Sequence, residues 1–250
     1  MQALKKPDLL VEESGYCGGC GYGVIQRLVA ECLEEMKLAH KAISVVDIAC
    51  GFWIIDCLDT DGIAGPHGRC AAVATAVKKV RPDSFVFVCA GDGASYSIGL
   101  AETMYAAMRD VPITMLIVNN GVFGMTGGQM SHSTTLLGDY SSSTPYGRDR
   151  KLNGAPVDML QILSCVDVEF IARGALYSPS AIMKTKEYIK KGFLNQAENK
   201  GFSVVEILSP CPANWGVSPV EANEKVKNEM EKTLFPLKVY RDRSCQVTVV

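Results

Sequence analysis

Two polar residues, Asp92 and Asn120, each follow a short apolar run that predicts a strand buried on both faces. The strands are expected at 85–90 and 113–118, and apolar residues at helical spacing over 97–109 predict a helix between them. Such a unit is parallel, so both strands end at the same edge of the sheet. Because neighbouring strands lie about 5 Å apart, the two side chains can meet on one cation.

A carboxylate and an amide carbonyl suit Mg²⁺, which keeps few protein ligands and completes its shell with waters and phosphates. Gly91 and Gly93 flank Asp92, and glycines allow backbone N–H groups at a helix start to approach those phosphates. The pattern therefore predicts a site for magnesium and a diphosphate. For a lone Gly-Asp-Gly the alternative is a turn with a capping Asp, and the paired Asn120 favours the metal site.

A second motif with chemical potential is Cys17-Gly18-Gly19-Cys20, which precedes an amphipathic helix expected over 24–36. A Cys-x-x-Cys pair brings two thiolates within reach of one metal, and its glycines let the backbone wrap around that metal. Three alternatives stay open: a thioredoxin-type dithiol, half of a zinc ribbon, and a flexible turn with buried thiols. The first would follow a strand, and the second would need another Cys-x-x-Cys, which the chain lacks.

Further thiolate ligands would have to be single cysteines. Cys50 follows a strand expected at 43–49 and Cys211 follows one at 202–208, so both belong to the edge that carries the predicted cation site. Spacing alone does not separate an iron–sulfur cluster from a four-thiolate zinc site. The remaining cysteines are expected to be structural and not metal ligands, namely Cys32, Cys57, Cys70, Cys89, Cys165 and Cys245.

The stretch from Gly65 to Arg69 opens a segment, 71–80, whose apolar spacing predicts a helix. His67 and Arg69 would then lie at a helix N-terminus beside the predicted diphosphate, where both can donate hydrogen bonds to its oxygens. A solvent-facing histidine at a helix start is the alternative. We expect His67 and Arg69 to belong to the site.

Composition limits the class of protein. The chain has 250 residues, 48% of them hydrophobic and 21% charged, as in an ordinary globular protein with one large core. The net charge of −2 and the scattered Lys and Arg residues argue against a nucleic-acid partner. No apolar run suggests export or membrane insertion, so a cytoplasmic location is expected. Ten cysteines in such a chain favour metal or redox chemistry over a disulfide scaffold.

The elements that must position these residues form one predicted α/β domain over 1–250, with a mostly parallel sheet and helices on both faces. The polar stretch 129–150 predicts a long surface loop that closes over the site or docks a partner, with His132 in solvent. The C-terminal tail is expected to be irregular. The later elements are expected at 157–164 (helix), 168–172 (strand), 180–192 (helix) and 219–233 (helix).

Gly91-Asp92-Gly93, Asn120 and the run from Val122 to Gln129 resemble the thiamine diphosphate motif of 2-oxoacid:ferredoxin oxidoreductases. More narrowly, the chain resembles their separate beta subunit, from about Cys17 to Pro219. The resemblance implies that Asp92, Asn120 and the backbone carbonyl of Val122 bind Mg²⁺. It also implies that His67 is a catalytic residue. The residues that it places against the cofactor or its substrate side are Gly51, His67, Arg69, Gly91, Gly93, Gly124, Met125 and Thr126.

In this family a Cys-x-x-Cys pair and two strand-end cysteines hold a 4Fe-4S cluster near the thiamine, and Cys17, Cys20, Cys50 and Cys211 match them. The implied reaction is the oxidative decarboxylation of a 2-oxo acid to acyl-CoA and CO2, with single electrons passing through the cluster to ferredoxin. The implied partners are alpha-type and gamma or delta subunits of a hetero-oligomer, besides coenzyme A. Thiamine enzymes place a Glu against the aminopyrimidine ring; no carboxylate here can be assigned to it, so an alpha-type subunit is expected to supply it.

Two other functions stay open. A thiamine-dependent decarboxylase or carboligase subunit without a redox role would share the stretch 91–120 and leave the four cysteines unused. A zinc-stapled binding module would use the cysteines and leave Asp92 and Asn120 as turn residues. A nicotinamide dehydrogenase is disfavoured, because Tyr96 stands where its fingerprint requires a third glycine.

Overall fold

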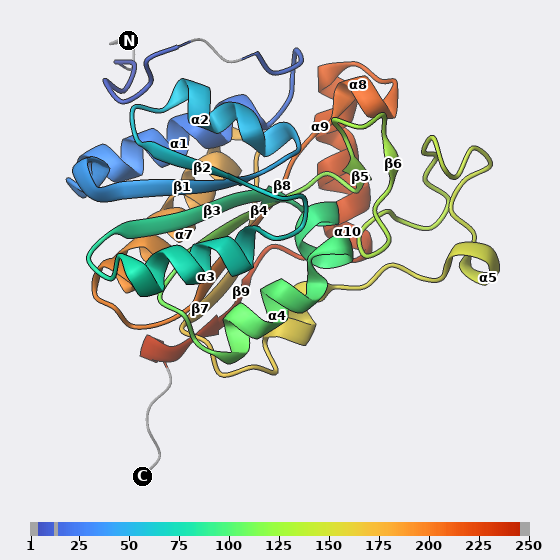
Figure 1. Cartoon of the computed structure of the whole chain (residues 1–250). Coiled ribbons are helices and arrows are strands. Elements are labelled where there is room, and N and C mark those ends of the chain that lie inside the picture. The colour runs from blue at the N-terminus through green and yellow to red at the C-terminus, as the bar shows by residue number, and fades with distance from the viewer. Residues whose placement is uncertain (1–4, 13–14, 246–250) are drawn as a thin grey trace.

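The computed structural model describes residues 5–12 and 15–245, and Figure 1 shows how their elements are arranged. In this part of the chain seven strands form one sheet, in the order β2-β1-β3-β4-β8-β7-β9. Neighbouring strands are parallel, except that β9 is antiparallel to β7. The strands are β1 (Ala42–Asp47), β2 (Asp61–Gly65), β3 (Phe85–Gly91), β4 (Thr114–Asn119), β7 (Phe170–Ala175), β8 (Ser203–Leu208) and β9 (Val239–Asp242).

Helices cover both faces of the sheet, as the sequence predicts (Figure 1). Phe85 and Phe87 of β3 pack toward one face, and Val86 and Val88 toward the other. Burial on both faces explains why this strand is apolar at every position, and the α/β fold class is confirmed. The first face carries α1 (Tyr22–Glu35), α2 (Ile54–Cys57) and α7 (Pro179–Ala197). The second face carries α3 (Cys70–Val80), α4 (Leu100–Met108) and α6 (Met159–Leu163).

Two edge strands, β2 and β9, were not predicted. The expectation of an irregular tail is wrong for β9, whose residues pair with Phe170, Ile171 and Ala172 of β7. Its sequence, Val-Tyr-Arg-Asp, is partly exposed and lacks the apolar run of a central strand, so periodicity alone does not reveal it. The last residues of the tail, 246–250, lie outside the described residues.

The predicted helix over 219–233 is present as α9 (Pro219–Lys225), the π-helical segment η4 (Val226–Met230) and α10 (Glu231–Thr233). A capping box between Ser218 and Glu221 starts it, with proline at the first helical position. Val226 and Met230 pack on residues at the ends of β7 and β8, which places this helix beside the carboxyl edge of the sheet. Within the described ranges, no helix is both long enough and apolar enough to cross a bilayer.

A buried ionic network lies behind the ends of β4, β7 and β8. Arg173 is fully buried, and its guanidinium contacts the Glu206 carboxylate at 2.7 Å and the Asp158 carboxylate at 2.5 Å. Glu206 also accepts hydrogen bonds from Asn119 and from the Tyr96 hydroxyl, both at 3.0 Å. Although burial opposes it, Arg173 lowers the pKa of Asp158. A satisfied buried network of this kind holds its strands in one register, and here it fixes the residue directly before Asn120.

Candidate active site

The ends of β3 and β4 bring the predicted cation ligands together. Gly91 pairs with Val118 across the two parallel strands, and the N–H of Asn120 donates to Asp92 Oδ1 at 3.4 Å. Both polar residues are buried. Burial raises the pKa of the Asp92 carboxyl to about 6, against the lowering effect of nearby hydroxyls. The geometry expected for a parallel unit is therefore present, and a buried carboxylate at this edge is suited to bind a cation.

The chain after Asp92 does not form the single helix predicted over 97–109. It forms the π-helical segment η3 (Gly93–Ile98), followed by α4. Short π-helical turns that interrupt helices are frequent at functional sites. A Cβ on Gly93 would lie 2.6 Å from Cζ of Phe123, so only glycine lets the loop after β4 cross this turn. The glycine is thus required by close packing of two loops that meet at the site.

Asp92 has a partner that the sequence did not reveal. The Thr134 hydroxyl donates a hydrogen bond to the second carboxylate oxygen of Asp92 and lies 2.7 Å from the Ser131 hydroxyl. Both residues are buried, although they belong to the stretch 129–150 that was predicted as a surface loop. The stretch is pinned by Arg148, whose guanidinium donates to backbone carbonyls at 2.5 and 2.7 Å. In the sequence, the run of hydroxyl residues was the one signal that could have indicated these partners of Asp92. His132, in the same stretch, is exposed as expected.

A second missed residue is Asp47, at the end of β1. This carboxylate is fully buried and lies 2.5 Å from Nδ1 of His67, and it accepts the N–H of Gly68 at 2.8 Å. His67 lines a small cavity together with Gly91, Gly93 and residues of the loop after β4. A carboxylate on Nδ1 fixes the orientation and tautomer of an imidazole, which leaves Nε2 free to act. The Asp47 carboxylate, at the end of the neighbouring strand β1, therefore holds the predicted histidine in place.

The four predicted cluster cysteines line one cavity of about 290 Å³. Tyr22, Cys50, Asn120 and Gly124 line both this cavity and the smaller one beside His67, so the two adjoin. The six cysteines predicted to be structural do not line it. All ten cysteines are free thiols. In the part of the chain that the structure describes, no three His, Cys, Asp or Glu side chains are placed closely enough to share one metal ion.

Three of the thiols around this cavity have a raised pKa, which favours their protonated form in the metal-free chain. Burial raises the pKa of Cys20 to about 12 and that of Cys50 to about 11, and neighbouring thiols add to the rise. Burial also raises the pKa of Cys211, while hydrogen bonds from Asn214 oppose it. A bound metal requires thiolates, so loading this cavity must release protons.

Not every predicted site residue reaches these cavities. The Arg69 guanidinium turns away and contacts the Glu102 carboxylate at 2.6 Å. Thr126 is exposed, and its hydroxyl bonds the Gln129 side chain at 2.7 Å. Gly51 packs on β3, where a Cβ would lie 2.8 Å from the carbonyl oxygen of Cys89. Met125 lines the cysteine cavity, as Gly124 does, and the roles of all these residues stay predictions.

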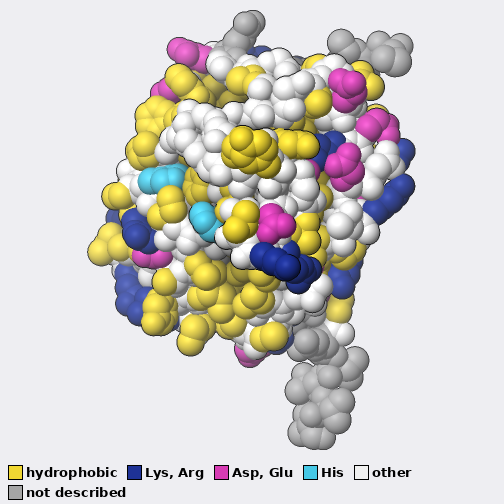
Figure 2. Space-filling view, turned by 90° about the vertical axis from the view of Figure 1, so that its right-hand side faces the viewer, with side chains coloured by type: hydrophobic (Ala, Val, Ile, Leu, Met, Phe, Trp, Pro, Cys, Tyr) yellow, Lys and Arg dark blue, Asp and Glu magenta, His cyan; other side chains and the backbone are white. Residues whose placement is uncertain are grey.

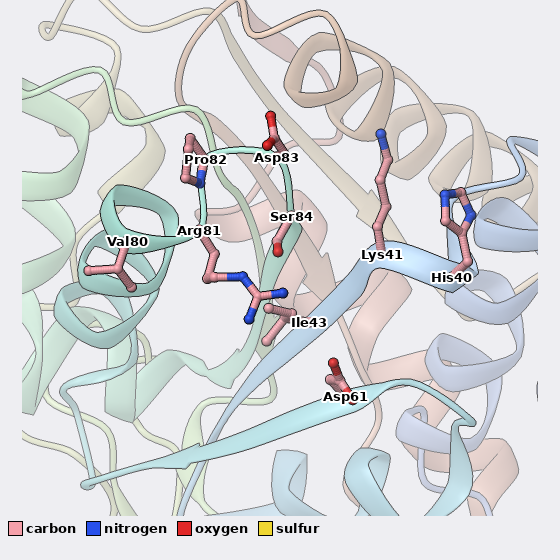
Figure 3. Close-up of a pocket in the computed structure, with 9 residues that line it drawn as sticks. All are labelled: His40, Lys41, Ile43, Asp61, Val80, Arg81, Pro82, Asp83 and Ser84. Atoms are coloured by element: carbon pink, nitrogen blue, oxygen red, sulfur yellow. The ribbon is translucent and has the colours of Figure 1, made fainter.

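A different hollow, of about 360 Å³, lies at the opposite edge of the sheet (Figure 3). Its lining residues carry both signs of charge, including Lys41, Arg81, Asp61 and Asp83. No predicted site residue lines it, and open parallel sheets bind ligands at the carboxyl ends of their strands. We therefore assign no role to this hollow.

Comparisons with known proteins match the chain to a thiamine pyrophosphate enzyme domain and to oxidoreductase subunits. The C-terminal TPP binding domain of thiamine pyrophosphate enzymes matches residues 54–207. The chain is 36% identical to ketoisovalerate oxidoreductase subunit VorA of Methanothermobacter thermautotrophicus, over 98% of this chain and 54% of that protein. It is 32% identical to 2-oxoacid:ferredoxin oxidoreductase subunit beta of Saccharolobus solfataricus, over 87% of this chain and 68% of that one. The chain thus spans about half the length of the first relative.

A solved structure has a similar fold. It is the 2-oxoglutarate:ferredoxin oxidoreductase from Magnetococcus marinus with 2-oxoglutarate, coenzyme A and succinyl-CoA bound. The TM-score is 0.76, and the alignment covers 99% of this chain and 88% of the other. At 23% sequence identity this likeness concerns the fold alone.

Proposed function

The chain belongs to the thiamine diphosphate-dependent 2-oxoacid:ferredoxin oxidoreductase family, and we propose that it is the beta-type subunit that carries the cofactor site. The proposed reaction is the oxidative decarboxylation of a 2-oxo acid to acyl-CoA and CO2, with single electrons leaving for ferredoxin. One observation carries the proposal. The predicted oxygen ligands after β3 and β4 and the four cysteines lie at one sheet edge, beside two adjoining cavities. Asn120, Val122 and the cysteines line these cavities, whereas Asp92 is fully buried next to Gly91 and Gly93, which line the smaller one.

The residues present fit the two cofactors. Asp92, Asn120 and the Val122 carbonyl would hold Mg²⁺. Gly91 would leave room for a diphosphate, because a Cβ there would meet only the Tyr22 hydroxyl, at 3.9 Å. Cys17, Cys20, Cys50 and Cys211 would hold a 4Fe-4S cluster. Thiamine diphosphate supplies a carbon nucleophile and electron sink for decarboxylation, and the cluster supplies a single-electron acceptor.

The placement of the cysteines favours a cluster over the zinc-stapled alternative. Four thiolates on one zinc ion, each with a bond of about 2.3 Å, would converge on a point. Among the described residues no three such side chains are placed closely enough to hold one ion, although the four cysteines line one cavity. The decarboxylase or carboligase alternative would leave this group of thiols without a role.

Partner subunits are part of the proposal. Neither cavity has a glutamate among its described lining residues, so the Glu that activates thiamine is proposed to come from an alpha-type subunit. The carboxyl edge faces the viewer in Figure 2, where hydrophobic side chains are exposed over a broad area. Leu137, Tyr140, Tyr146 and Leu152 are exposed on the segment that projects from this edge in Figure 1. Large exposed apolar areas mark interaction sites.

Gamma or delta subunits, coenzyme A and ferredoxin complete the proposed system. We also propose a cytoplasmic location, where reducing conditions keep thiols free.

The experiment that tests the proposal is metal and sulfide analysis of the full chain purified without oxygen, together with titration by thiamine diphosphate and Mg²⁺. We expect about four irons and four sulfides per chain and saturable thiamine diphosphate binding. Zinc, or no metal, would remove the ferredoxin chemistry, and failure to bind thiamine diphosphate would favour the zinc-stapled module. Decarboxylation by the chain alone, with coenzyme A and an acceptor supplied, would overturn the need for an alpha-type subunit.

Asp47 is proposed to position His67 for this reaction. Asp47→Asn keeps an acceptor for the Gly68 N–H but removes the charge beside Nδ1, so the imidazole loses its fixed tautomer. We expect kcat of the complex reconstituted with its alpha-type subunit to fall about 10- to 100-fold, with little change in KM for the 2-oxo acid. Steady-state kinetics check this, with the exposed Asp59→Asn as the matched control. An unchanged kcat in Asp47→Asn would refute the positioning role.

A further inference from the structure

Asn214 lines the cysteine cavity and contacts Gly124, a residue that lines both cavities. Its side-chain Nδ2 donates to the carbonyl oxygen of Gly124 at 3.1 Å and to Sγ of Cys211 at 3.3 Å. A side-chain amide has two N–H donors, so both are used. One acceptor belongs to the loop predicted to lie against thiamine diphosphate, and the other is a predicted cluster ligand.

The loop after β4 is also shaped to receive this side chain. Gly128 has a φ of +75°, and a Cβ there would lie 2.7 Å from Oδ1 of Asn214. The loop therefore closes against Asn214 at two positions, Gly124 and Gly128. A shift of this loop would move the amide that bonds the Cys211 sulfur.

A purely local role does not account for these contacts. Asn214 belongs to the four-residue helix α8 (Pro212–Trp215), which starts with proline and ends at Gly216 in the left-handed conformation. Cys211, the N-cap residue of this helix, makes no side-chain cap hydrogen bond. The Asn214 amide donates outward, across 90 positions of sequence, to Gly124. It therefore joins two sites and does not cap its own helix.

We infer that Asn214 tunes the reduction potential of the cluster and couples that potential to thiamine diphosphate binding; this inference rests on the proposed function. An N–H donor to a ligand sulfur stabilises the extra negative charge of the reduced cluster, which raises its potential. When thiamine diphosphate binds, it orders the loop from Gly124 to Gly128. This ordering sets the strength of the hydrogen bond from Asn214 to the Cys211 sulfur. Coupling between two sites is reciprocal, so reduction of the cluster changes thiamine diphosphate affinity by the same factor.

The test measures the midpoint potential of the cluster by spectroscopic redox titration of the full chain, purified without oxygen, with and without Mg²⁺ and thiamine diphosphate. Asn214→Leu keeps the approximate size of the side chain and removes both donors. We expect a lower midpoint potential in this variant and loss of the shift that thiamine diphosphate causes in the wild-type chain. The exposed Asn228→Leu, on the C-terminal helical segment, is the control and keeps both properties.

Asn214→Asp provides a second test in case the leucine variant loses the cluster. It preserves the shape, replaces the donor with an acceptor, and adds a negative charge beside Cys211, so a larger fall in potential is expected. The contrary result is a variant that retains iron at the wild-type level and shows an unchanged midpoint potential and an unchanged thiamine-dependent shift. That result would overturn the inference about Asn214 and leave the proposed function standing. Absence of iron from the wild-type chain would instead overturn the proposed function, and the inference with it.

Discussion

Replacing Asp92 with asparagine is expected to weaken the binding of Mg²⁺ and thiamine diphosphate by about a hundredfold or more. Asp92 is fully buried between the two glycines that line the cavity beside His67. Its carboxylate carries the negative charge that Asn120 and a backbone carbonyl lack, and Mg²⁺ depends on such a ligand. Isothermal titration of the full chain with thiamine diphosphate at saturating Mg²⁺ measures the loss.

Thermal denaturation separates this loss of affinity from damage to the fold. The single amide oxygen of asparagine can still accept the hydrogen bond of Thr134, so only the long 3.4 Å bond from the Asn120 N–H is lost, and the variant no longer buries a charge. We therefore expect the cofactor-free variant to melt at or above the Tm of the wild-type chain. The cofactor should raise the Tm of the wild-type chain and of the exposed control Asp83→Asn, but not that of Asp92→Asn. Unchanged thiamine diphosphate affinity in Asp92→Asn would rule out the metal-binding role.

Replacing Cys50 with serine is expected to reduce the iron content of the anaerobically purified chain from about four atoms to about three or fewer. Cys50 lines both cavities, and a serine hydroxyl does not ionise readily enough to replace a thiolate ligand. Iron and acid-labile sulfide analysis measures the change. Thiamine diphosphate should still bind, because the oxygen ligands are untouched.

Two control variants make this result specific to the cavity. Cys57→Ala removes a buried thiol seven positions further along the chain that does not line the cavity, and Cys165→Ser changes an exposed one. Both should retain the full iron and sulfide content. Iron loss in Cys57→Ala equal to that in Cys50→Ser, at equal Tm, would contradict the assigned ligand set.

The parts of the site that the sequence predicted follow from local periodicity and the geometry of parallel strands. Uniformly apolar runs mark strands buried on both faces, and their carboxyl ends share one edge. Asp92 and Asn120 therefore had to meet, and Cys50 and Cys211 had to lie on the same side of the molecule. The resemblance to a known family added the identity of the cofactors, which spacing alone left open.

Other parts depended on partners that are distant in the sequence. The edge strand β9 is recognisable only beside β7, because an exposed edge imposes no apolar run. The π-helical turn after Asp92 has the composition of an ordinary helix, and it is decided by the packing of Gly93 on Phe123. The same holds for Arg69, whose guanidinium contacts the Glu102 carboxylate across 33 positions of sequence, while its role at the cofactor stays a prediction.

The sequence by itself determined the α/β class, the edge at which ligands bind and the residues that strand ends deliver to that edge. Only the tertiary structure decided which polar groups support them: Asp47 behind His67, Thr134 beneath Asp92 and Asn214 between Gly124 and Cys211. The physical reason is that strand ends are set by short-range patterns of burial. Apart from the bond to Cys211, these supporting hydrogen bonds join segments separated by 20 to 90 positions, and only the folded chain brings such segments within reach of each other.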